Sequence, residues 1–214
     1  SHDLRTPLTA LIGQIETIRL KGDALPPDAQ AHLLDRALHN AQHLKRLTDA
    51  LAELARLDSP EFRAQPEPIA IGELADDVVQ RFASAAQQAG VTLGVEYPDG
   101  LPLTRADAAL IERALSDLID NALRVTPSGG RVLVRALREG DGVRIEVADT
   151  GPGVASEDQP RVFERFYQTS RHREHRGSSG LGLAIVKRVA ELHGGTAGLR
   201  SEPGRGSAVF IDLP

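Results

Sequence analysis

The stretch SHDLRTPLTALIGQIETIRL (residues 1–20) determines the first part of the fold. Its apolar residues recur at alternating intervals of four and three, which defines a heptad seam: Leu4, Leu8, Leu11, Ile15 and Ile18. Residues 21–28 (KGDALPPD) then break the pattern with a glycine and two prolines. A second helix repeats the spacing, with its seam expected at Leu33, Ala37, Ala41, Leu44, Thr48, Leu51 and Ala55. Since one hairpin cannot cover both apolar faces, we expect residues 1–57 to form a homodimeric four-helix bundle.

The same stretch places a histidine away from the apolar seam. His2, Thr6 and Thr9 follow one another at helical intervals on a different face, so His2 is expected to point toward solvent. Most exposed histidines have no special role, and no second His or Cys lies four residues on to complete a metal site. The first helix alone therefore leaves the role of His2 open.

Beyond residue 58 the pattern becomes mixed. Three prolines within residues 59–69 predict a linker at 59–68. Helices are expected at about 72–89, 105–125 and 181–193, and strands at about 91–97, 130–138, 143–149 and in a final hairpin that turns at 203–206. Helices with a mostly antiparallel sheet predict an α+β fold, in which a two-layer α/β sandwich over residues 69–214 follows the helical hairpin 1–58.

The composition excludes several classes of protein. The net charge of −5 argues against general nucleic-acid binding, and the absence of Cys excludes disulfides and thiolate metal sites. No apolar run approaches the roughly 20 residues of a membrane-spanning helix. Because Met is also absent, we expect a fragment whose missing N-terminal part could be membrane-bound.

Two glycine-containing stretches are compatible with nucleotide binding. VADTGPGV (147–154) places Asp149 at the end of a buried strand, where its carboxylate could accept a hydrogen bond from an exocyclic amine such as that of adenine. GSSGLGLAIV (177–186) places glycines where a loop becomes a helix, whose N-terminus offers N–H groups to phosphate. An ordinary turn and an ordinary loop would give the same patterns, so neither stretch requires a nucleotide.

Two further stretches add groups suited to metal and phosphate. In ALIERALSDLIDNALRVTP (109–127) a polar row separate from the apolar face contains Arg113, Asp117, Asn121 and Arg124. Oxygen donors suit Mg²⁺ and arginine suits phosphate, although a solvated helix face has the same pattern. RVFERFYQ (161–168) precedes a cluster of Arg and His that could close over a triphosphate or could be surface.

Taken in order, these stretches resemble the conserved boxes of sensor histidine kinases of bacterial two-component systems. SHDLRTPLT resembles the H box, SDLIDNALRVTP the N box, VADTGPG the G1 box, RVFERFY the F box, GSSGLGL the G2 box and GRGSAVFIDLP the closing G3 region. The resemblance covers essentially the whole chain. It implies a dimeric phospho-acceptor hairpin, a Bergerat-type ATP-binding domain, and the cytoplasmic portion of a membrane-anchored sensor kinase.

The resemblance also implies a reaction and roles for individual residues. His2 would take the γ-phosphoryl group of ATP, Asp3 would orient its ring or take up its proton, and the group would pass to an aspartate of a response regulator. Thr6 would position water for dephosphorylating that regulator. ATP and Mg²⁺ would be bound by the following residues: Asn121 and Asp117 for Mg²⁺, Arg124 for phosphate in place of the usual Lys, Asp149 with Gly151 and Gly153 for adenine, Gly177, Gly180, Leu181 and Gly182 along the phosphates, and Arg165 in the lid.

Three positions depart from the family pattern. The family often has Asn at the position of Asp117, an aromatic residue at that of Val125, and Gly at that of Ser178. They leave an alternative open, a nucleotide-binding dimeric scaffold with a degenerate ATP site. ATPases of the gyrase, chaperone and mismatch-repair type share the nucleotide fold, but lack the H-box hairpin and usually carry a hydrolytic Glu in the Asn-box helix. Glu112 lies nine positions before Asn121, on a different part of the helix.

Overall fold

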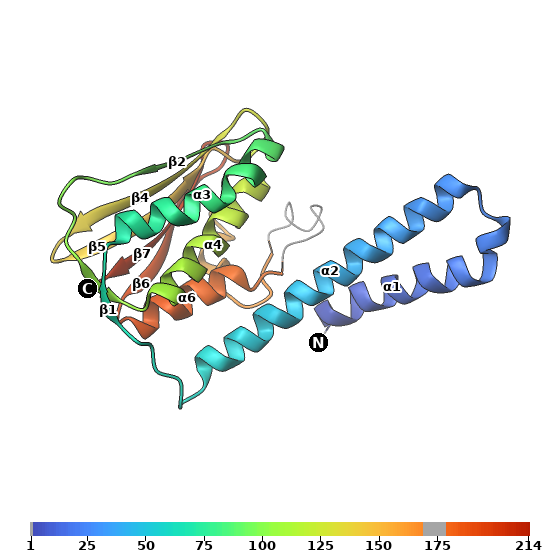
Figure 1. Ribbon diagram of the computed structural model, residues 1–214, viewed down its shortest axis with the longest axis horizontal. Coiled ribbons are helices and arrows are strands. Elements are labelled where there is room, and N and C mark those ends of the chain that lie inside the picture. The colour runs from blue at the N-terminus through green and yellow to red at the C-terminus, as the bar shows by residue number, and fades with distance from the viewer. Residues whose placement is uncertain (1, 169–178) are drawn as a thin grey trace.

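A computed structural model describes residues 2–168 and 179–214 of the chain (Figure 1). The first two helices, α1 (His2–Lys21) and α2 (Pro27–Asp58), form an antiparallel hairpin through the short 3₁₀ helix η1 (Gly22–Ala24). The proline at the first position of α2 suits a helix start, because its missing N–H would have had no partner there. None of the described helices has a stretch long and apolar enough to span a membrane.

The seam predicted for the hairpin is only partly buried within one chain. Leu11 and Ile18 are half-buried, whereas Leu8 and Ile15 are 43% and 52% exposed. Between the two helices Asn40 Nδ2 donates a hydrogen bond of 3.1 Å to Oε1 of the buried Gln14. A helix that contacts a single neighbour can bury only part of a wide apolar face, so the rest remains exposed on the hairpin.

The second half of α2 packs on the remainder of the chain. Leu47, Ala50, Leu54 and Leu57 are at most 5% exposed and belong to the same hydrophobic cluster as the core of the sheet domain. The seam predicted for this half, with Thr48, Leu51 and Ala55, lies on a different face that is exposed within one chain, so its burial against a second copy stays a prediction. The helix changes the face that it buries, since the neighbour of its second half is a helix of the sheet domain, α6 (Gly182–Leu192) (Figure 1).

The sheet domain has two layers, and this confirms the α+β prediction. Its five-stranded sheet has the order β2-β4-β5-β7-β6, in which β2 and β4 are parallel and the other neighbours antiparallel. The strands are β2 (Thr92–Glu96), β4 (Arg131–Glu139), β5 (Gly142–Asp149), β6 (Thr196–Glu202) and β7 (Gly206–Leu213). Helices α3 (Ile71–Ala89), α4 (Ala108–Val125) and α6 cover one face of the sheet (Figure 1).

A small second sheet was absent from the sequence-based prediction. Strands β1 (Glu67–Ile69) and β3 (Thr104–Ala106) pair antiparallel, so β1 begins inside the expected linker. The helix expected from residue 105 begins instead at Ala108, after Asp107 accepts a hydrogen bond from the N–H of Leu110. Strands of three residues are too short to show an alternating pattern, which explains why they were missed.

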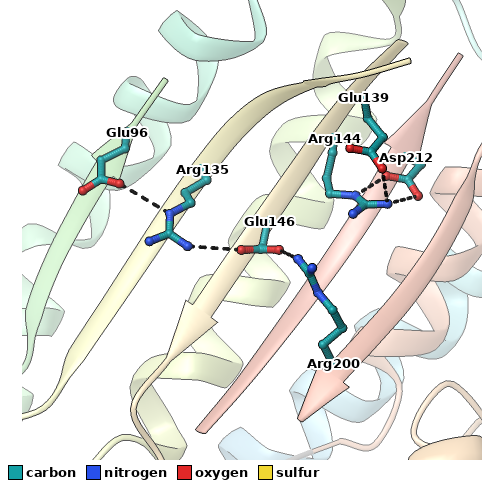
Figure 2. A network of polar contacts seen from close by, with 7 residues as sticks. All are labelled: Glu96, Arg135, Glu139, Arg144, Glu146, Arg200 and Asp212. Atoms are coloured by element: carbon teal, nitrogen blue, oxygen red, sulfur yellow. Dashed lines mark hydrogen bonds and ion pairs between the residues drawn. The ribbon is translucent and has the colours of Figure 1, made fainter. Parts of the chain in front are cut away.

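Opposite the helices, charged side chains form a network across the sheet (Figure 2). On β5, Ile145 and its alternate neighbours are buried against the helices, and Glu146 lies on the other face. Although Glu146 is 3% exposed, it contacts Arg135 at 3.4 Å and also pairs with Arg200. A buried carboxylate is tolerated when cations surround it, so these pairs allow Glu146 to lie within the sheet.

Candidate functional site

A cavity lies between α4, the segment after β5, and the start of α6; we refer to it as the α4 cavity. Seven of the residues proposed from the sequence line it: Asp117, Asn121, Arg124, Asp149, Gly153, Gly180 and Gly182. The other lining residues are Asp120, Val125, Pro152, Val154, Val162, Tyr167, Gln168, Ser179, Leu183, Leu199, Ser207 and Val209. Segments up to about 90 residues apart in the chain therefore build one site.

Asp149 provides a carboxylate at the end of β5. Its Oδ1 accepts a hydrogen bond of 2.7 Å from the N–H of Gly151. Burial raises the pKa of Asp149, while the backbone N–H groups of Gly151 and Ser207 act in the opposite direction. A half-buried acceptor held by the backbone in this way is suited to an amine on a planar ligand.

Two glycines keep the backbone close to Asp149. A Cβ on Gly151 would lie 2.6 Å from Asp149 Oδ1, so a larger residue would displace the carboxylate. Gly151 itself does not line the cavity but lies behind Asp149. Gly153 has a φ of +68°, and its missing Cβ would collide with the carbonyl of Glu202. Both positions require glycine for the shape of this loop.

Helix α4 presents the polar row predicted from the sequence. Its apolar row packs into the core, because Ile111, Leu115 and Leu118 are at most 2% exposed. This arrangement leaves Asn121 and Arg124 on the side of the cavity. Arg124 forms an ion pair with Asp120, one helical turn earlier, and both residues line the cavity wall.

Asp117 is the most perturbed group of the cavity. Its Oδ1 lies 3.3 Å from Nη2 of Arg113, and its buried Oδ2 makes no hydrogen bond within the described part of the chain. Burial raises the pKa of Asp117 to about 7, Arg113 lowers it, and Glu53 of α2 raises it further. A buried oxygen without a partner, beside the amide of Asn121, is chemically suited to a cation.

These two oxygen donors could not hold a cation alone. Among the described residues, no three His, Asp or Glu side chains come together as a metal site. Mg²⁺ commonly binds through one or two protein oxygens and completes its shell with phosphate oxygens and water. The residues present therefore fit Mg²⁺ bound together with a nucleotide.

The start of α6 forms the wall opposite α4. Gly182 begins the helix, and a Cβ there would lie 3.7 Å from Asp117. Leu181, expected along the phosphates, is fully buried in the core and does not line the cavity. Gly177 lies outside the described residues. The first N–H groups of α6 have no helical acceptors, so this end of the helix can bind an anion.

The remaining proposed residues lie elsewhere. Arg165 does not line the cavity but forms an ion pair of 2.5 Å with Asp58 at the end of α2. His2, Asp3 and Thr6 lie in the first turns of α1 and do not line it either. Thr6 is exposed, whereas the side chains of His2 and Asp3 lie outside the described part of the chain. A reaction at His2 thus requires the cavity and the hairpin to approach each other, within one chain or between two.

Sequence reasoning missed most of the apolar wall. Val154, Leu199 and Val209 line the cavity from three different segments. The alternation along the final hairpin could have assigned Val209 to the inner face, but which inner residues border a cavity depends on packing. Tyr167 was likewise unassigned; its hydroxyl donates a hydrogen bond of 2.5 Å to Asp158.

Two family models match the chain. Residues 1–60 match the His Kinase A (phospho-acceptor) domain, and residues 106–214 match the histidine kinase-, DNA gyrase B-, and HSP90-like ATPase. Every residue that lines the α4 cavity falls within the second match, and His2 falls within the first.

Individual proteins are similar over the whole chain. The sensor protein DivL of Caulobacter vibrioides is 40% identical over 215 residues, which cover 100% of this chain and 27% of DivL. The crystal structure of full-length ShkA in complex with AMPPNP has a TM-score of 0.75 at 30% identity, covering 100% of this chain and 44% of ShkA.

The fold also resembles ThkA, solved in complex with the response regulator protein TrrA, with a TM-score of 0.81. At 21% identity this likeness shows the fold alone, and it covers 100% of this chain and 59% of ThkA. The chain therefore spans less than two thirds of each of these three proteins.

Proposed function

Because the chain belongs to the bacterial two-component sensor histidine kinases, we propose that it is an ATP-dependent autokinase core that phosphorylates His2. The phosphoryl group would then pass to an aspartate of a response regulator. The observation that carries this proposal is the meeting of Asn121, Arg124 and Asp149 in one cavity of an ATPase domain that is joined to a phospho-acceptor hairpin.

Different residues of the cavity would bind the adenine, the phosphates and the Mg²⁺ of MgATP. Asp149 accepts a hydrogen bond from the adenine amine, while Gly151 and Gly153 maintain the shape of the loop that follows it. Arg124 and the N–H groups at the start of α6 contact the phosphates. Asn121 and Asp117 would hold Mg²⁺, which would supply positive charge to neutralise the phosphate oxygens. Arg165 would join the lid once it leaves Asp58.

His2 would be the nucleophile. An imidazole with an unperturbed pKa near 6.5 is mostly neutral at pH 7 and carries a lone pair. That lone pair attacks the γ-phosphorus in line, an N–P bond forms, and the bond to the bridging oxygen breaks to release ADP. Asp3 would hold the ring or accept its proton, which requires a suitable rotamer because neighbours on a helix do not face each other.

The hairpin would supply the partner surfaces. Leu8, Ile12, Ile15, Leu34 and Leu38 are between 43% and 59% exposed on it. Burying them against a second copy through residues 1–57 gives a homodimer, with about 1.5–3 kcal/mol per fully buried side chain. We also propose the division into hairpin 1–58, linker 59–68 and catalytic domain 69–214.

A response regulator would dock on the hairpin near His2. The complex of ThkA with its response regulator supports this type of partner. Thr6 lies one turn after His2 and is exposed, so it could position water for dephosphorylating the regulator. We place this core in the cytoplasm, as part of a sensor anchored in the membrane by segments other than residues 1–214.

The test is incubation with γ-labelled ATP and Mg²⁺ of the wild type and of a His2→Gln variant. A label that is lost in acid, survives in base and is absent from the variant is the expected result. Label on both proteins would contradict the assignment of His2, and an absence of nucleotide binding would contradict the function. The alternative of a degenerate scaffold has no support from the cavity, which keeps the nucleotide-binding groups together.

A further inference from the structure

Arg113 connects a residue of helix α2 with a residue that lines the α4 cavity. Arg113 of α4 lies between two carboxylates: its Nε is 3.2 Å from Oε2 of Glu53, and its Nη2 is 3.3 Å from Oδ1 of Asp117. Glu53 belongs to the hairpin, whereas Asp117 lines the cavity. The guanidinium therefore connects the phospho-acceptor hairpin with the nucleotide site.

Arg113 does not form a full set of hydrogen bonds with either Glu53 or Asp117. Its buried Nε makes no well-aligned hydrogen bond, so the short distance to Glu53 reflects an ion pair of poor geometry. Asp117 keeps its second oxygen without a hydrogen-bond partner in the described residues. An arginine paired with a single carboxylate normally donates two parallel hydrogen bonds, and this geometry is lost when two acids share it.

The contact with Glu53 depends on where α2 lies. At the end of α2, Asp58 pairs with Arg165 at 2.5 Å and with Arg188 at 3.3 Å. Arg188 also donates hydrogen bonds of 3.2 and 3.1 Å to the carbonyl of Leu57. Two cations at the C-terminus of a helix are favourable, because that end carries the negative pole of the helix dipole. These contacts hold α2 beside α6 (Figure 1). They also keep Glu53 next to Arg113.

We propose that Arg113 is a positioning residue for Asp117, and that Glu53 controls it according to the position of α2. With α2 in place, Arg113 is divided between the two acids. When α2 leaves, Arg113 turns wholly to Asp117 and forms the paired geometry. This inference rests on the proposed function, because it describes how the hairpin tunes the affinity of the same site for nucleotide.

The charges give the direction of the effect. While Glu53 shares the guanidinium of Arg113, Asp117 is only partly neutralised and directs more negative charge toward the cavity; once Glu53 is removed, Arg113 and Asp117 form a balanced pair. A nucleotide brings several negative charges, so it binds more weakly while Glu53 is in contact. By thermodynamic reciprocity, nucleotide binding must then favour the release of α2.

The first experiment compares the affinities of the wild type, Glu53→Gln and Glu112→Gln for a non-hydrolysable ATP analogue with Mg²⁺. Glu112 is a matched control, because it lies on α4, pairs with Arg81 at 2.6 Å and does not line the cavity. We expect Glu53→Gln to bind about fivefold more tightly, at the lower end of the usual range for coupled sites. Glu112→Gln should bind as the wild type does. Equal affinities for all three proteins would overturn the proposal.

A double-mutant cycle tests whether Glu53 acts through Arg113 on Asp117. Glu53→Gln is repeated in an Asp117→Asn background, which retains a side chain of the same shape. The gain in affinity should disappear there, and a gain that persists would overturn the pathway. Arg113→Gln offers a second background, used where thermal unfolding shows that it folds.

A third readout separates this role from a structural one. Amide hydrogen exchange of residues 47–58 should become faster when the analogue binds, and a fixed structural contact would not respond in this way. Unchanged hydrogen exchange in these residues would contradict the coupling between nucleotide binding and the release of α2. This inference alone would be refuted if the wild type binds the analogue and is labelled on His2 by γ-labelled ATP, but the double-mutant cycle of Glu53 and Asp117 shows no coupling. A wild type that binds no analogue would refute the proposed function as well.

Discussion

The backbone N–H of Phe166 donates a hydrogen bond of 2.8 Å to the carbonyl of Gly180. This bond joins the segment before residue 169 to the start of α6, two parts of the cavity wall. Both residues have a positive φ, +64° for Phe166 and +65° for Gly180. A non-glycine residue in this region is strained, and such strain persists only where its surroundings hold it.

Gly180→Ala should damage this junction. The added Cβ would lie 2.8 Å from the carbonyl carbon of Phe166, in addition to the conformational cost of about 1–2 kcal/mol for a positive φ. We expect a lower free energy of unfolding, measured with urea, and at least a tenfold weaker affinity for an ATP analogue. Gly204→Ala is the control, since its φ is +82° but its Cβ would meet nothing within 4 Å. Similar losses of affinity in both variants would contradict a role for the junction.

Asp149→Asn should reduce affinity for adenine nucleotides in particular. An amide keeps an oxygen for the N–H of Gly151 but loses the charge that strengthens a bond to an amine. A hydrogen bond to a charged group contributes about 1.5–3 kcal/mol, so the affinity should fall by roughly one to two orders of magnitude. Competition titrations with adenine and guanine nucleotides would measure the loss of preference. Asp141→Asn, in the exposed turn between β4 and β5, should have no effect.

Asp117→Asn should change the pH dependence of stability. The pKa of Asp117 is about 7 in the fold and 3.8 as its ordinary value. Between these values the folded state binds more protons than the unfolded state, so stability falls as the pH rises. The loss of folding stability caused by ionising the buried Asp117 is absent below about pH 4 and complete above about pH 7. At about 1.4 kcal/mol per pKa unit, this loss is at most about 4 kcal/mol.

Urea unfolding in the presence of a chelator, at pH 4.5 and 7.5, tests this prediction. The difference in unfolding free energy between the Asn variant and the wild type should grow in favour of the variant at the higher pH. Parallel pH profiles for the two proteins would show that Asp117 is not desolvated in the fold.

The sequence predicted individual helices and strands better than it predicted which of them pack against one another. The period of α4 separated its polar row from the buried Ile111 and Leu115, because a helix with one covered face must show that period. On α2 the same reasoning found one apolar face but missed another after residue 47. A heptad seam shows that a face is apolar but not which neighbour covers it, and the second half of α2 also buries Leu54 and Leu57 against the sheet domain.

Contacts between distant segments could likewise not be predicted from the sequence. Asp117 and Arg113 were placed in one row by their spacing, but the approach of Glu53 depends on how the hairpin packs. Leu181 was assigned to the phosphates as part of the glycine-rich stretch, whereas its large apolar side chain is buried in the core. Physical size decides such a case, because the site needs small residues beside the ligand and the core needs large ones.

The exposed apolar side chains of the hairpin give a last prediction. Leu38 is 59% exposed on α2, and a carboxylate there would be buried if two copies form the four-helix bundle. Leu38→Glu should therefore shift the protein from dimer to monomer, because an unpaired charge in an apolar interface costs several kcal/mol. Sedimentation over a range of concentrations measures the change. Leu103→Glu is the matched control, since Leu103 is 65% exposed outside the hairpin and should tolerate a charge.

The same variant separates assembly from nucleotide binding. None of the described residues that line the α4 cavity belongs to the hairpin, so monomeric Leu38→Glu should still bind the ATP analogue. If phosphorylation of His2 occurs between subunits, labelling should fall with the dimer, whereas labelling within one chain should survive dissociation. A variant that remains dimeric would show that this face of the hairpin is not the dimer interface.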